Sequence, residues 1–187
     1  MKIVCIAWGS LLWRPGELNL ASNWVPGGPA LPLEFARDSD DSDELALVLC
    51  EGATPVPTYI AEMATADVDE AKAQLRLREK VSPDRPEWIA SIRAGDAGQD
   101  GVPATVGQWL TRHAFDAAIW TAIPPKFRGQ NGRVPSEDEA LEHLGSLTGK
   151  AKRTAEDYVR WIPADIMTPY RAGFGQHLGW TPLPRLA

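Results

Sequence analysis

The change in hydrophobic period near residue 67 constrains the fold more than any other feature of the sequence. Before it, short apolar segments are separated by Gly, Pro and Asp: KIVCIAW (2–8), LPLEFAR (31–37), LALVLCEG (45–52) and TYIAEM (58–63). Segments of this length between turn residues are typical of β-strands. After it, apolar residues recur at helical spacing. This order predicts a single α+β domain over residues 1–187, with an antiparallel or mixed sheet and no regular βαβ alternation.

Capping signals place the expected helices. Asp67 with Glu70 has the form of a capping box, and the helix that follows is expected to end near Pro83. Ser136 with Glu139 forms a second box at the start of another helix. The other expected elements are a helix over 106–114, a strand over 115–123 and a last helix over 150–161. The segments expected to be irregular are 14–30, the acidic turn 38–44, the kink 54–57, the long loop 82–104 with an ordered patch at Trp88–Ile89, and the tail from 163 onward.

Composition excludes several classes of function. A net charge of −6 argues against nucleic acid as a partner, because binding it requires basic residues that neutralise phosphates. No apolar stretch approaches the roughly 20 residues that span a bilayer, and we interpret the apolar N-terminus as a buried first strand. Cys5 and Cys50 lie far apart in apolar runs, which predicts buried thiols in a reducing cytoplasm.

Motifs for several common chemistries are absent from the sequence. The three histidines, His113, His143 and His177, are dispersed and match no metal-binding spacing. Ser10 lies in WGSLL and lacks the G-x-S-x-G pattern of a nucleophile elbow. Gly173, Gly175 and Gly179 come too close to the C-terminus for a dinucleotide-binding unit. We therefore expect no metal and no cofactor.

Two features remain as candidates for a functional site. At Trp8-Gly9-Ser10-Leu11-Leu12 a strand that bends over Gly-Ser would direct successive N–H groups into one cavity, which suits an anion. Glu79 lies near the expected end of a helix, between Arg78 and Lys80. For both features a purely structural interpretation exists: a β-bulge at Gly9-Ser10, and a solvated helix end at Glu79.

At these two places the sequence resembles the γ-glutamylcyclotransferase-like superfamily, most closely its ChaC-type branch. WGSLLWRPG is similar to the family's strand that runs into Tyr-Gly-Ser, and LRLREK to its helix that ends in Leu-x-x-Arg-Glu-Lys. The resemblance covers residues 3–80. It implies a small barrel-like sheet with flanking helices, Glu79 as the catalytic acid/base, and backbone N–H groups of Gly9, Ser10 and Leu11 on the substrate.

Two further points depend on the same resemblance. LPLEFARDS matches the family's second-strand segment, which implies that Arg37 and Ser39 line the pocket. Trp8 stands where the family has Tyr, so a contact made there by a phenol would differ in this chain.

Leu75, Leu77 and nearby tryptophans are expected to surround the Glu79 side chain and raise its pKa.

The implied reaction is the cyclisation of a small γ-glutamyl amide, whose own α-amine attacks its γ-carbonyl and releases 5-oxoproline. Because the nucleophile belongs to the substrate, the reaction needs no Ser, Cys or metal. Two alternatives are a related enzyme acting on γ-glutamylamines or removing a γ-glutamyl protecting group, and a binding module for γ-glutamyl compounds or 5-oxoproline that has lost the chemistry. A plain structural domain is the third, and the sequence leaves the oligomeric state open.

Overall fold

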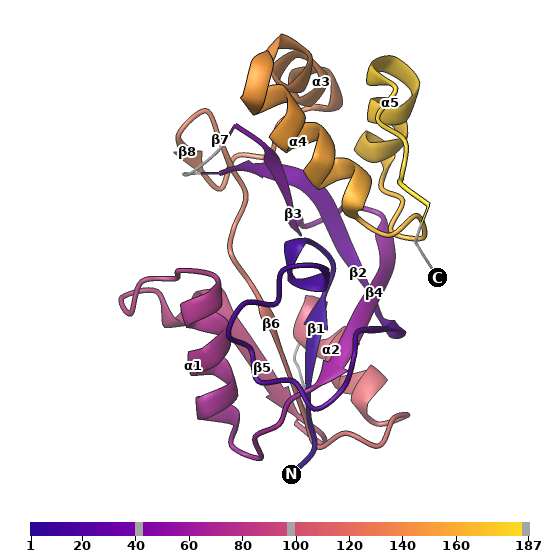
Figure 1. The fold of residues 1–187 in the computed structure, drawn as a ribbon. Coiled ribbons are helices and arrows are strands. Elements are labelled where there is room, and N and C mark those ends of the chain that lie inside the picture. The colour runs from indigo at the N-terminus through magenta and orange to yellow at the C-terminus, as the bar shows by residue number, and fades with distance from the viewer. Residues whose placement is uncertain (40–42, 97–99, 185–187) are drawn as a thin grey trace. The chain divides into compact units, whose positions relative to one another are not determined.

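The computed structural model describes residues 1–39, 43–96 and 100–184 (Figure 1). Within them the chain forms eight strands and five α-helices, an α+β fold with a mixed sheet, as expected. Two compact units are built from interleaved segments: unit 1 from Met1–Leu31 and Pro57–Ile123, and unit 2 from Pro32–Val56 and Pro124–Ala187. That all 187 residues form one domain stays a prediction.

In unit 1 the strands of the sheet run in the order β5-β6-β1-β4. Their bounds are β1 Ile3–Ala7, β4 Pro55–Glu62, β5 Ile89–Arg93 and β6 Ala117–Thr121. Strand β1 pairs antiparallel with β4 and parallel with β6, so it is hydrogen-bonded on both edges. All five of its residues are buried, which explains why its sequence is a continuous apolar run without alternation.

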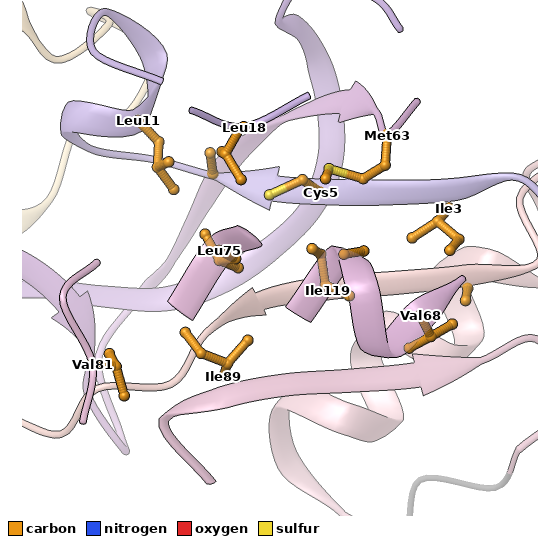
Figure 2. Close-up of a cluster of buried hydrophobic side chains, with 13 residues drawn as sticks. Ile3, Cys5, Leu11, Leu18, Met63, Val68, Leu75, Val81, Ile89 and Ile119 are labelled. Carbon is orange, nitrogen blue, oxygen red and sulfur yellow. The ribbon is translucent and has the colours of Figure 1, made fainter. Parts of the chain in front are cut away.

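Helix α1 (Val68–Arg78) packs against β5 and β6 and contributes to the core of unit 1. Figure 2 shows this core, in which Leu75 of α1 lies among side chains that include Cys5 and Leu11. The Asp67 carboxylate caps the helix by accepting from the N–H groups of Asp69 and Glu70. In a complete capping box the Glu70 side chain would also accept from the backbone N–H of Asp67. Here the Glu70 carboxylate accepts from the Thr65 hydroxyl instead.

The expected end of α1 near Pro83 is wrong, because the helix already ends at Arg78. Lys80 adopts a left-handed conformation with a φ of 54°. Its N–H donates to the Leu77 carbonyl, and the N–H of Val81 donates to the Arg76 carbonyl. These are the two hydrogen bonds of a Schellman motif, which terminates a helix by satisfying its last carbonyls.

The expected ordered patch at Trp88–Ile89 is confirmed, but order extends further into the expected long loop over 82–104, and residues 97–99 of that loop lie outside the described residues. The 3₁₀ turn Pro86–Trp88 leads into β5, and helix α2 (Gly101–Leu110) begins five residues before the expected helix. Strand β5 pairs antiparallel with β6 along its whole length, with Ser91 opposite Ile119. The segment is therefore a strand because a partner strand is present, despite its weak local signal.

Strand β2 (Val25–Asp38) begins inside the expected loop 14–30. Within unit 1, the carbonyl of Gly27 accepts from the Trp109 indole N–H and the carbonyl of Pro29 accepts from the Thr58 hydroxyl. A Cβ at Gly28 would lie 2.3 Å from Oγ1 of Thr58, so only glycine fits there. Strand β4 likewise begins at Pro55, where a kink was expected.

Unit 2 contains the second half of β2 with three shorter strands and three helices. Their bounds are β3 Leu45–Leu49, β7 Lys126–Phe127, β8 Gln130–Asn131, α3 Glu137–Ser146, α4 Gly149–Trp161 and α5 Pro169–Leu178. The β2–β3 hairpin is antiparallel, as expected, and both bonds of the Ser136–Glu139 capping box are present. Residues 40–42 of the expected acidic turn lie outside the described residues.

Helix α5 occupies the tail that was expected to be irregular. Thr168 caps its N-terminus, Pro169 is its first residue, and Gly179 follows its last residue with a φ of 73°. Thr-Pro before a helix and Gly after it are ordinary start and stop signals. Phe174 of α5 packs edge-to-face on Phe35 of β2, with 5.3 Å between ring centroids, which ties the helix to the core of unit 2.

The two cysteines are free and buried, as expected. Among the helices of the described chain, none has the length and apolar character that crossing a membrane requires.

Candidate active site

The opening strand ends at Ala7 and gives way to a 3₁₀ turn over Ser10–Leu12. Gly9 precedes the turn with φ −124° and ψ −138°. Within the turn, the N–H of Leu12 donates to the Gly9 carbonyl. The first N–H groups of such a turn, those of Ser10 and Leu11, have no acceptor inside it. The Gly-Ser pair therefore ends the strand and presents backbone donors at the end of β1.

Glu79 caps the C-terminus of α1, and its side chain is 17% exposed. Its Oε1 accepts a hydrogen bond of 2.7 Å from Nη1 of Arg78. Burial raises the pKa of the Glu79 carboxyl, and the positive charge and hydrogen bond of Arg78 oppose that rise without cancelling it. A carboxyl with a raised pKa is a stronger proton acceptor than an ordinary carboxyl, and it can return the proton later.

Arg78 joins the carboxylate to the turn. While its Nη1 binds Glu79, its Nη2 donates to the Ser10 hydroxyl at 3.0 Å and to the Arg14 carbonyl at 2.7 Å. The Nε of the same side chain also donates to the Arg14 carbonyl, at 3.1 Å. Glu79 and the Gly-Ser turn are thus separated by a single guanidinium group.

The turn and the helix that carry these groups both contribute side chains to the core of unit 1. Leu11 of the turn and Leu75 of α1 both belong to it (Figure 2). The charge of Glu79 contributes to raising the pKa of the Cys5 thiol, after the larger effect of burial, so β1 and the carboxylate are close enough to interact electrostatically. Leu75 is fully buried, but Leu77 is 64% exposed, so the expectation that Leu77 walls in Glu79 is wrong.

The remaining predicted site residues divide between the two units. Trp8 directly follows β1 and is 4% exposed. Arg37 and Ser39 belong to unit 2, where Nη1 of Arg37 donates to the Pro124 carbonyl and the N–H of Ser39 donates to the Glu44 carbonyl. Their role in lining a pocket stays a prediction.

The sequence interpretation missed the part that Arg78 plays in this arrangement. The signal was present: Arg78 follows Leu75 by three residues, and residues three apart share a face of a helix. An arginine that continues a buried stripe must direct its guanidinium to acceptors at the edge of the core. Here those acceptors are Glu79, Ser10 and Arg14.

The site suits proton transfer and the binding of a negatively charged oxygen. No group of three or more His, Cys, Asp or Glu side chains within the described ranges is arranged to hold a metal ion. The carboxylate offers a proton acceptor with a raised pKa, and the turn offers backbone N–H donors. This pairing of an acid/base group with donors for an oxyanion is what amide chemistry at a carbonyl requires.

Comparison with known proteins found no matching family model and no matching curated protein. The chain is similar to two solved structures of a yeast γ-glutamyl cyclotransferase specific to glutathione, one of them selenomethionine-labelled. The labelled structure is 13% identical, with 98% of this chain and 90% of the other covered and a TM-score of 0.47. The other is 12% identical, with 100% and 93% covered and a TM-score of 0.48.

Proposed function

We propose that this chain is a γ-glutamyl cyclotransferase that releases 5-oxoproline from a small γ-glutamyl amide or peptide. The observation that carries the proposal is the bridge through Arg78, which brings the Glu79 carboxylate within one guanidinium of the Gly9–Leu11 turn. The family resemblance of WGSLL and LRLREK assigns the same two elements to catalysis and substrate binding. The bridge joins these elements, which are far apart in the sequence.

In the proposed reaction the substrate supplies its own nucleophile. The α-amine attacks the γ-carbonyl carbon, a C–N bond forms to close the five-membered ring, and the amide C–N bond to the leaving amine breaks. Holding the γ-glutamyl group in a folded shape favours this step, since effective molarities of about 10⁵ M or more are reached in well-oriented intramolecular reactions.

Glu79 carries the proton in this mechanism. Its carboxylate accepts a proton from the attacking nitrogen and then donates that proton to the departing nitrogen, so the carboxylate is regenerated at the end of each cycle. Burial favours this double role because it raises the pKa of the carboxyl above its ordinary value. The neighbouring charge of Arg78 opposes this rise and so favours the ionised form, which is the form that accepts the proton.

The Gly-Ser turn stabilises the negative oxygen that forms on the γ-carbonyl. Backbone N–H groups of Gly9, Ser10 and Leu11 are the donors, and one such donor contributes about 3 kcal/mol in comparable sites. Backbone donors explain why a glycine and a small serine stand at the end of a buried strand.

The test is the variant Glu79→Gln, which removes the proton carrier and keeps the shape of the side chain. Release of 5-oxoproline is measured with glutathione, γ-glutamyl dipeptides and γ-glutamylamines as substrates. We expect turnover to fall by about 10² to 10⁴-fold, the usual contribution of a general acid/base. Calorimetry should show that 5-oxoproline still binds.

The matched control is Glu87→Gln, because the Glu87 side chain is 58% exposed and its ion pair with Arg85 lies at the surface. This control should keep the turnover of the natural chain. Undiminished turnover in Glu79→Gln would refute the assignment of the acid/base. Binding of 5-oxoproline by the natural chain, with no turnover of any γ-glutamyl compound, would instead identify a binding module.

A further inference from the structure

Among the described residues of unit 1, the guanidinium of Arg78 makes four hydrogen bonds to three different residues. Nε and Nη2 donate to the Arg14 carbonyl, Nη2 also donates to the Ser10 hydroxyl, and Nη1 donates to Oε1 of Glu79. The side chain is 13% exposed, and a Cβ at Gly16 would lie 3.2 Å from its Cγ. Arg78 is therefore held along its length, and few rotamers remain open to it.

The two oxygens of the Glu79 carboxylate have different surroundings. Oε1 is bound to Arg78 at 2.7 Å. In the part of the chain that the structure describes, no donor binds Oε2. Oε2 is also not fully buried. Oε1 is thus held on the protein side, and Oε2 is the oxygen that no described donor binds.

Building on the proposed function, we propose that Arg78 is a positioning residue that holds Oε1 of Glu79 beside the Gly-Ser turn and leaves Oε2 to exchange the proton. In the cycle, Oε2 accepts the proton from the attacking α-amine and returns it to the leaving amine. Arg78 keeps its own proton throughout, as arginines in proteins do. Its contacts with Ser10 and Arg14 fix the turn relative to the carboxylate.

The charges around Glu79 predict how the loss of Arg78 acts on it. Arg78 of α1 lowers the pKa that burial has raised. The Cys5 thiol of β1 faces the same region, but its own pKa is raised far above neutrality, so it adds no charge there. Removing the guanidinium leaves burial unopposed, and the pKa of Glu79 should rise further.

Two variants separate the charge of Arg78 from its geometry. Arg78→Met removes both, whereas Arg78→Lys keeps a positive charge but lacks the planar fork that serves several acceptors at once. Arg76→Met is the matched control: it removes one positive charge from the last turn of the same helix. Thermal unfolding establishes that each variant is folded before it is assayed.

The first measurement is an NMR titration of the Glu79 side-chain carboxyl in the ¹³C-labelled chain, with Glu79→Gln to assign the signal. We expect a higher titration midpoint in Arg78→Met and an unchanged one in Arg76→Met. The second measurement is turnover, for which we expect a fall in kcat of about 10²-fold in both Arg78 variants, the usual effect of a misplaced catalytic group. KM should change little.

An unchanged Glu79 titration in folded Arg78→Met would overturn the inference, as would full turnover in Arg78→Lys. If Arg78→Met does not fold, Arg78→Lys carries the test through its kcat and its Glu79 titration. Failure of the proposed function is distinguishable, because it appears as no turnover in the natural chain. In that case the NMR titration still decides whether Arg78 controls Glu79.

Discussion

Leu75 and Leu77 offer a direct test of how the core supports the candidate site. They lie two residues apart on α1, but Leu75 is fully buried in the core of unit 1 and Leu77 is 64% exposed. Replacing a buried leucine by alanine costs about 2–5 kcal/mol, because apolar contacts are lost and a cavity remains. At roughly 2–4 °C per kcal/mol for a chain of this size, Leu75→Ala should lower the Tm by about 4–20 °C.

Leu77→Ala is the matched control, since it removes the same atoms from an exposed position of the same helix. Its effect on the free energy of unfolding should stay within about 0.5 kcal/mol. Urea unfolding followed by circular dichroism measures both variants, and the midpoint should shift without a change in slope. Equal destabilisation by the two substitutions, or none by Leu75→Ala, would refute the assignment of Leu75 to the core.

Two further predictions concern pH and helix capping. Burial raises the pKa of Glu79, and the proposed base must be ionised to accept a proton. The value of kcat/KM should therefore fall as the pH drops through that raised pKa. This fall at acid pH should be absent from any residual activity of Glu79→Gln. Thr168→Ala should lower the free energy of unfolding by about 2–4 kcal/mol, because it removes both the N-cap of α5 and a donor to the buried Glu34 carboxylate. Thr148→Ala, at an N-cap with no side-chain bond, should cost under about 0.5 kcal/mol when both are measured by urea unfolding.

The sequence alone determined the elements whose signals lie within a few residues of one another. Residues 3–7 form a strand within the expected range 2–8, the turn at Gly9-Ser10 follows it, and the Ser136–Glu139 capping box starts a helix, as expected. Such features depend on local backbone preferences and on hydrogen bonds that span three or four residues. The position of Glu79 at the end of a helix was visible for the same reason.

Only the tertiary structure decided the elements that depend on distant partners. Residues 89–93 form a strand because β6 lies beside them, and β2 starts at Val25 within a segment rich in Pro and Gly, where Trp109 and Thr58 bind its carbonyls. Helix α5 is an exception, because its Thr-Pro and Gly signals were present in the sequence and were not used.

The candidate site likewise combines features set by the local sequence with features set by distant residues. The sequence placed Arg78 on the buried stripe of α1, yet its direction depends on acceptors at Ser10 and Arg14, more than sixty residues away along the chain. A long flexible side chain has many rotamers, and nearby residues in the sequence do not select among them. Acceptors brought together by folding select one, and that choice determines which oxygen of Glu79 the guanidinium binds.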